Sequence, residues 1–202
     1  MKSDKIDISY TKAAEAIKVA ILNAQYEAAK GVNNIQLMLY YAIGRFISQN
    51  TRKQKWGTNA VATISHLLKQ DMPGLRGYLE SNIKRMRTFY EEWRELDNSP
   101  IQTGEIQILP FNFPTIDAFP ANDFRSIGFT HHSEILAKCK TREERIFYIS
   151  TCAREHLTPD GIKNCIAQKL FEQKGKLPNN FLQKLPTGNL AKRAILAFKD
   201  QY

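Results

Sequence analysis

The sequence contains few cysteines, and their spacing does not suit a metal site. Only Cys139, Cys152 and Cys165 occur among 202 residues, and each follows the previous one by 13 positions. An odd number at this spacing matches neither a disulfide framework nor the Cys-x-x-Cys ligand pairs of a zinc site. We therefore expect three reduced thiols that lie on helices and pack as small hydrophobic side chains, and no bound metal.

Long hydrophobic runs are also missing. The longest uncharged stretches, such as residues 31–44, are too short and too polar to cross a bilayer. The first residues lead into no apolar segment and no small-residue cleavage site, which a secretory signal would require. These absences predict a cytoplasmic protein that does not bind a membrane.

The motifs of common enzyme classes are absent as well. There is no Gly-x-Gly-x-x-Gly, no phosphate-loop lysine and no Gly-x-Ser-x-Gly elbow. The neighbours His131 and His132 have no third ligand at metal spacing, so we expect core or capping roles for them. Asp160, Glu172 and Lys174 superficially match a Mg²⁺-dependent nuclease motif, but no strand pair is predicted to hold them. The sequence thus predicts a non-catalytic chain without a cofactor.

Positive charge, by contrast, is in excess. The chain carries 29 Lys+Arg against 20 Asp+Glu, a net charge of +9. Residues 52–94 hold nine basic and four acidic side chains and residues 140–202 hold twelve and six, whereas residues 95–139 hold two and six. Two basic blocks around an acidic connector attract polyanions, nucleic acid first, although a solvated surface without a partner has the same composition.

Apolar residues recur at helical spacing along most of the chain, which predicts a mainly α fold. Brief alternation at 106–109 predicts a short strand or wing. The predicted architecture is a helix-turn-helix or winged-helix-like domain with a long N-terminal helical hairpin or single helix. Residues 1–96 form its N-terminal helical region, residues 97–128 a connector rich in Phe and Pro, and residues 129–202 a C-terminal helical subdomain and tail.

Residues with capping chemistry stand before four of the predicted helices. Thr58 and Ser81 precede the apolar stripes at 60–68 and 83–93, and each is expected to be an N-cap. Thr141 with Glu144 has the form of a capping box, and Thr158 with the following Pro is a typical helix start.

The helix predicted at 81–93 is the strongest candidate for contact with nucleic acid. Its apolar residues fall on one side, so Lys and Arg side chains near its start project from the other. The N-terminal residues of a recognition helix meet base edges, and its first amides favour phosphate. The candidate residues on this helix are Ser81, Lys84, Arg85, Arg87 and Thr88. Glu91 and Glu92 leave an ordinary amphipathic helix as the alternative.

Further basic residues extend this candidate interface. Contacts to the DNA backbone are expected from Arg52, Lys53, Lys55 and Arg76. A second, weaker surface is expected on the helix after Thr158, because a helix, a short turn and a polar-faced helix again have a helix-turn-helix outline. Its candidate residues are Lys163, Asn164 and Lys169.

Five segments resemble, in order, the sequence patterns of one family. They contain Ile-Gly-Arg (40–47), Trp-Gly and Met-Pro-Gly (56–74), Met-Arg-Thr-Phe-Tyr (81–90), Phe-Thr-His-His-Ser (127–136) and Glu-Glu-Arg-Ile-Phe-Tyr (142–148). This is the YhcG-like family, domain of unknown function 1016, and the resemblance covers about residues 10–175. Phe129 departs from it, because the family usually has Trp there.

The resemblance implies a DNA-binding module attached to a nuclease. Family members commonly continue into a PD-(D/E)XK-type nuclease domain, which is missing here, so we expect a truncated chain or a stand-alone gene that is not an enzyme by itself. DNA is the expected partner, with a homodimer and a nuclease domain or partner as further possibilities. The alternatives are RNA binding, or a protein-interaction or dimerisation module based on the alanine-rich stripes at 13–28 and 35–47.

Overall fold

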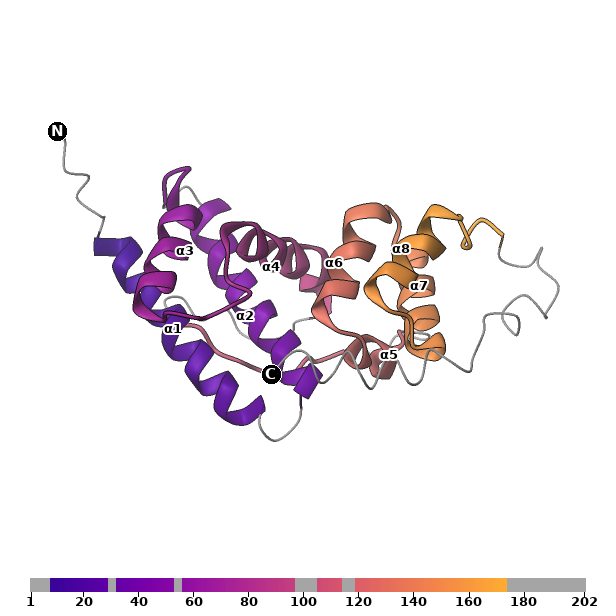
Figure 1. Ribbon diagram of the computed structural model, residues 1–202, viewed down its shortest axis with the longest axis horizontal. Helices are drawn as coiled ribbons and strands as arrows, with labels where there is room; N and C mark the ends of the chain where they lie inside the picture. Colours follow the sequence, from indigo (N-terminus) through magenta and orange to yellow (C-terminus); the bar gives the residue numbers. More distant parts are fainter. Residues whose placement is uncertain (1–7, 29–31, 53–55, 97–104, 114–118, 174–202) are drawn as a thin grey trace. The chain divides into compact units, whose positions relative to one another are not determined.

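The structure is a computed structural model that describes residues 8–28, 32–52, 56–96, 105–113 and 119–173 (Figure 1). The chain divides into two compact units, Met1–Ile116 and Asp117–Tyr202, here called the N-terminal and C-terminal units. The division falls inside the predicted connector 97–128. All regular structure in the described ranges is helical, which confirms the mainly α fold.

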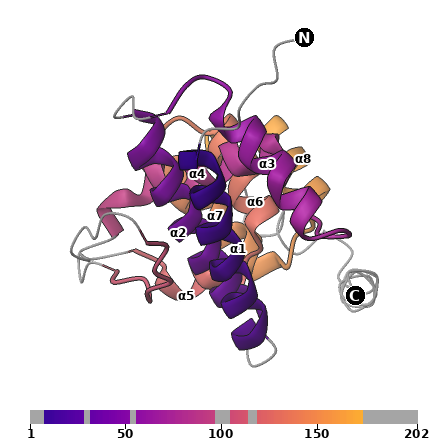
Figure 2. The same ribbon diagram turned by 90° about the vertical axis from the view of Figure 1, so that its left-hand side faces the viewer.

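The N-terminal unit contains four α-helices. They are α1 (Ile8–Ala28), α2 (Val32–Arg52), α3 (Ala60–Asp71) and α4 (Glu80–Trp93), and the short 3-10 helix η1 (Arg94–Leu96) follows α4. Helix α1 packs against α2 and α3, so the hairpin and not the single long helix is formed. Figures 1 and 2 show α1 and α3 side by side.

Helix α2 is the centre of this unit because it is buried along most of its length and packs against α4. The two helices approach most closely at Gly44, where an added Cβ would overlap the Met86 carbonyl oxygen. Small or absent side chains allow such close packing of helix backbones, so Gly44 is a packing position rather than a flexible one.

The alanine-rich stripe of α1 is part of the core of this unit. Ala13, Ala14, Ile17, Ala20 and Ile21 are all buried within the chain. The surface on which the dimerisation interpretation was based is therefore already covered by α2 and α3 up to Ile21. A homodimer stays a prediction, and these buried residues of α1 are not available to it.

The predicted strand at 106–109 is not formed. Residues 106–113 are neither helix nor strand, and in the described part of the chain no strand lies beside them. A strand needs a partner edge for its backbone groups. Side chains of α2 hold this segment instead: Arg45 donates to the Gln107 carbonyl oxygen, and the rings of Tyr41 and Phe111 lie 5.3 Å apart.

The C-terminal unit contains α5 (Ala121–Ser126), α6 (Phe129–Lys138), α7 (Arg142–Glu155) and α8 (Pro159–Ala167). Helix α5 packs on α7, and α6 packs on α7 and α8. Phe124 and His132 are fully buried with rings 4.4 Å apart. Phe124, which lies within the predicted connector, therefore packs into the core of this unit.

The histidines and cysteines of this unit have structural roles. His132 Nε2 lies 2.9 Å from the Phe124 carbonyl oxygen, and complete burial lowers the pKa of His132 to about 3. Cys139, Cys152 and Cys165 are buried and free, which confirms reduced thiols, although Cys139 follows α6 and does not lie in it. Burial raises the pKa of Cys152 to about 12, so its thiol is protonated and inert.

Two of the four predicted caps are confirmed. Thr141 Oγ1 accepts from the Glu144 amide at 3.2 Å, and Thr158 Oγ1 accepts from the Gly161 amide at 3.1 Å. The expected caps at Thr58 and Ser81 are wrong. Asn59 occupies the cap position of α3 without a side-chain hydrogen bond. Helix α4 starts before Ser81 because the Leu79 carbonyl already accepts from the amides of residues 82 and 83.

Candidate nucleic-acid interface

Helix α4 has one buried side and one exposed side. Ile83, Met86, Phe89 and Trp93 are buried, while Tyr90 is half-buried against the Tyr41 ring at 5.1 Å. The predicted contact residues Ser81, Lys84, Arg85 and Thr88 are all exposed. The helical periodicity therefore placed the polar side of α4 correctly.

The cations on this exposed side are concentrated in the first half of α4. Lys84 Nζ forms an ion pair with Glu80 one turn earlier, and the Lys84 side chain remains 52% exposed. Such a surface pair is readily exchanged for another anion. Arg85 is exposed, and in the described ranges it has neither an ion pair nor a hydrogen bond. The Thr88 hydroxyl donates to the Lys84 carbonyl oxygen at 3.2 Å.

Two other predicted contact residues, Arg52 and Arg87, join α2 to α4 through Glu91. Arg52 Nε and a terminal nitrogen donate to the two Glu91 carboxylate oxygens, both at 2.8 Å. Ser48 Oγ also donates to Glu91 at 2.8 Å, and Arg87 Nε lies 4.0 Å away. We call Ser48, Arg52, Arg87 and Glu91 the Glu91 cluster. Its hydrogen bonds, from Arg52 first, lower the pKa of the Glu91 carboxyl despite partial burial.

The connection between α3 and α4 presents Arg76. It spans residues 72–79, eight in all, and is longer than the three or four residues of a helix-turn-helix turn. The connection between α3 and α4 is therefore not a helix-turn-helix turn. The connection is nevertheless anchored, because Ser65 Oγ donates to the Tyr78 carbonyl at 3.0 Å and the Tyr78 ring packs on Tyr40. Arg76 is exposed on it, whereas Lys53 and Lys55 lie outside the described residues.

In the C-terminal unit the predicted second surface lies on and after α8. Lys163 Nζ is 3.1 Å from Asp160 and 3.9 Å from Glu134, and Lys169 Nζ is 3.1 Å from Glu172. Carboxylates thus offset both cations, while Asn164 is exposed beside them. This surface is polar but carries little net charge.

Sequence comparison assigns a family to this arrangement. The DUF1016 N-terminal domain matches residues 16–173, which is more than half of the chain. The chain belongs to this family. No curated protein and no solved structure matches it. The match spans helices of both units, so the family domain is larger than the N-terminal unit alone.

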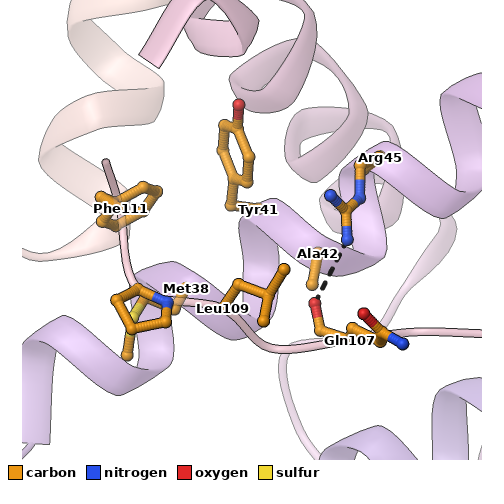
Figure 3. Close-up of a pocket in the computed structure, with 8 residues that line it drawn as sticks. Met38, Tyr41, Ala42, Arg45, Gln107, Leu109 and Phe111 are labelled. Carbon is orange, nitrogen blue, oxygen red and sulfur yellow. Dashed lines mark hydrogen bonds between the residues drawn. The ribbon is translucent and has the colours of Figure 1, made fainter. Parts of the chain in front are cut away.

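A shallow pocket of the DUF1016 domain lies between α2 and residues 107–111 (Figure 3). Arg45 is buried there and donates to the Gln107 carbonyl at 3.4 Å, while the Tyr41 hydroxyl donates to the Trp93 carbonyl at 3.3 Å. The free space holds roughly one water molecule, so the pocket cannot enclose a substrate. Its polar groups hold the 105–113 segment and the end of α4 on α2.

The described ranges contain neither a membrane-spanning helix nor a metal-binding group. The described helices of the DUF1016 domain are all too short or too polar to cross a membrane. Within the same residues, His, Cys, Asp and Glu side chains form no group of three that could hold a metal ion.

Sequence analysis missed Glu91 as the partner of Arg52 and Arg87. Glu91 and Arg52 are 39 residues apart, and no local pattern pairs them. The one available signal was helical phase, because Glu91 lies one turn after Arg87 on the flank of α4.

Proposed function

We propose that this DUF1016 domain binds duplex DNA through the first half of α4 and does not catalyse a reaction by itself. The observation that carries the proposal is the exposed pair Lys84 and Arg85 on the side of α4 that does not pack against its unit. Arg76, exposed on the anchored connection before α4, adds a third cation. These three residues form the phosphate-binding face.

The distribution of charge along α4 supports an approach by its N-terminal half. Lys84, Arg85 and Arg87 outnumber Glu80 in the first two turns. At the far end and in η1 the acids Glu91, Glu92 and Glu95 outnumber Arg94. Carboxylates along a DNA groove would be repelled by phosphates, so the helix cannot lie along it for its full length. Entry by the N-terminal half is the geometry of recognition helices.

The Glu91 cluster limits how many cations take part. Arg52 and Arg87 already share Glu91, so the phosphate-binding face provides three contacts rather than the larger number that counting basic residues suggests. Three neutralised phosphates contribute about −2.7 to the slope of log K against log salt. This contribution alone lowers affinity for any duplex by roughly 40-fold between 50 and 200 mM salt.

A salt titration of two matched variants tests this proposal. In Lys84→Ala/Arg85→Ala we expect weaker binding to a 20-base-pair duplex and a slope shallower by about 1.8, because two phosphate contacts are lost. Fluorescence anisotropy measures both quantities. The control Lys12→Ala/Lys18→Ala removes the same charge from α1, with one cation exposed and the other ion-paired to Glu15.

The control should keep the wild-type slope, and both variants should keep the wild-type melting temperature. Equal slopes in the α4 variant and the wild type would refute the proposed face. Single-stranded DNA and duplex RNA belong in the same titration, since tighter binding to RNA at every salt concentration would favour the RNA alternative. Attachment to a nuclease domain stays a prediction from the family resemblance.

A further inference from the structure

We propose that α8 contacts base edges in the DNA major groove and provides sequence preference, with Asp160, Asn164 and Gln168 as the contacting side chains. This inference rests on the proposed DNA binding and adds a second element to it. Contacts to phosphate position a protein on DNA, whereas contacts to base edges select the sequence. The phosphate-binding face of the N-terminal unit supplies the first kind of contact and α8 supplies the second.

The three side chains lie in one strip. Asp160 and Asn164 are four residues apart, so they sit one turn apart on the same side of α8. Gln168 follows four residues later as the C-cap residue directly after Ala167, and its helical backbone conformation (φ −79°) continues the strip. The opposite side is buried through Ile162 and Cys165. All three members are exposed, and the Asp160 side chain is 88% exposed.

The chemistry of the strip matches base edges better than phosphates. A carboxamide both donates and accepts, as adenine N6 and N7 require, and a carboxylate accepts from cytosine N4. The side-chain amides of Asn164 and Gln168 have no hydrogen-bond partner within residues 119–173. Their bonding capacity is therefore available to a ligand, and a phosphate oxygen would use only the donor half of it.

The turn before α8 has the length that a helix-turn-helix uses. Residues 156–158 join α7 to α8, and His156 adopts the left-handed conformation with φ 49° and ψ 45°. The Leu157 amide donates to the Cys152 carbonyl at 3.1 Å, and His131 Nε2 lies 2.9 Å from the Leu157 carbonyl oxygen. A three-residue turn fixed in this way holds the start of α8 in one orientation.

The end of α8 is fixed as well. The Tyr148 hydroxyl of α7 lies 3.5 Å from the Cys165 carbonyl and accepts from the Phe171 amide at 3.3 Å. Side chains held on a rigid element discriminate between ligands better than side chains on a loop. The strip is thus presented by a helix secured at both ends.

Lys163 and Lys169 flank the strip and can follow the DNA backbone. Their ion pairs with Asp160 and Glu172 are exposed and weak enough for phosphate to replace. The longer contact of Lys163 with Glu134, at 3.9 Å, is given up at the same time. When Lys163 binds a phosphate in place of Asp160, the Asp160 carboxylate can accept a hydrogen bond from a base edge. The low net charge of this surface then favours selection of sequence over general attraction to DNA.

Selection from a random duplex library tests the inference. The wild-type chain should enrich a motif with adenines roughly two base pairs apart, since four residues of helix rise about 6 Å and one base step about 3.4 Å. The variant Asn164→Ala/Gln168→Ala should lose this motif. Its affinity for the enriched duplex should fall at least about fivefold for each bidentate contact between a side-chain amide and an adenine that is lost. The control Gln70→Ala/Asn122→Ala removes two exposed amides elsewhere and should enrich the wild-type motif.

The results separate this inference from the proposed function. Lys84→Ala/Arg85→Ala should bind every duplex more weakly and still enrich the wild-type motif. If the wild type binds duplex without enriching a motif, or the α8 variant enriches the same one, the assignment of α8 is overturned and the phosphate-binding face stands. If the wild type binds no duplex at any salt concentration, both are overturned.

Discussion

At the scale of single residues, the packing of α2 against α4 depends on the absence of a side chain at Gly44. Gly44 allows the backbones of α2 and α4 to touch, and the neighbour that a Cβ would meet is the Met86 backbone rather than a flexible side chain. Because α4 carries the phosphate-binding face, a change at Gly44 also displaces that face.

We expect Gly44→Ala to destabilise the N-terminal unit by about 1–3 kcal/mol, the usual cost of overpacking, because the two helices must separate. Urea unfolding followed by far-ultraviolet circular dichroism, which reports on the helices of both units, measures this change. Gly128→Ala is the control, since its Cβ would make an ordinary contact of 3.6 Å with His131 Nδ1. An alanine at residue 44 that left the midpoint unchanged would show that the helices are not in this close contact.

Residue-scale patterns were also the most predictable from sequence. Thr141 and Thr158 cap their helices through amides three residues on, so the chemistry is complete within one turn. Ser81 has the same chemistry, yet α4 begins at Glu80, where a carboxylate already favours the first turn. A cap can be recognised locally, but which of two adjacent starts is used depends on how the helix packs.

At the scale of elements, the Glu91 cluster couples α4 to the end of α2. Glu91 accepts from Arg52 and Ser48, and these contacts span 39 and 43 residues of sequence. Periodicity predicted both helices and their buried sides, because each stripe is local. It could not predict this coupling, nor the binding of residues 105–113 to α2 in place of a strand, because both depend on contacts between distant segments.

The cluster makes stability depend on pH. Because the pKa of Glu91 is lowered in the folded protein, the cluster stabilises the fold above the ordinary carboxyl pKa of 4.5, and this contribution is lost as pH falls through the folded value. We expect Glu91→Gln to be less stable than wild type at pH 7, with the difference shrinking below about pH 4.5.

Chemical denaturation at pH 7 and pH 3 measures this difference. Protonation of the buried His132 in the unfolded state destabilises both proteins in acid, so the comparison between them isolates Glu91. Glu92→Gln is the control, because it removes a neighbouring charge and keeps the Arg52 hydrogen bonds. A gap of constant size at both pH values would show that Glu91 does not act through its charge.

At the scale of the whole molecule, some basic side chains pair with carboxylates of the same chain and others remain accessible to a ligand. The excess of +9 predicted a polyanion partner, but five of the predicted cations have carboxylate partners: Arg52, Lys84, Arg87, Lys163 and Lys169. Counting charges could not foresee this, because pairing is decided by the fold. The cations that remain accessible among the predicted residues are concentrated on and before α4.

The cysteines provide a prediction for the C-terminal unit. Burial raises the pKa of Cys139 and Cys152 to about 12, and Cys165 is buried too, so all three thiols should resist an aromatic disulfide reagent in the native protein. Unfolding in urea should make all three react at once. Rapid reaction of one thiol without denaturant would show that the C-terminal unit opens locally at that site.

The two units also carry different natural reporters. Both tryptophans, Trp56 and Trp93, belong to the N-terminal unit, and every cysteine belongs to the C-terminal unit. Emission on heating therefore follows one half of the protein, and thiol labelling follows the other, without any added dye or engineered site. Because a ligand protects the part it binds, adding duplex to both assays reveals which half is protected, and whether the halves melt together.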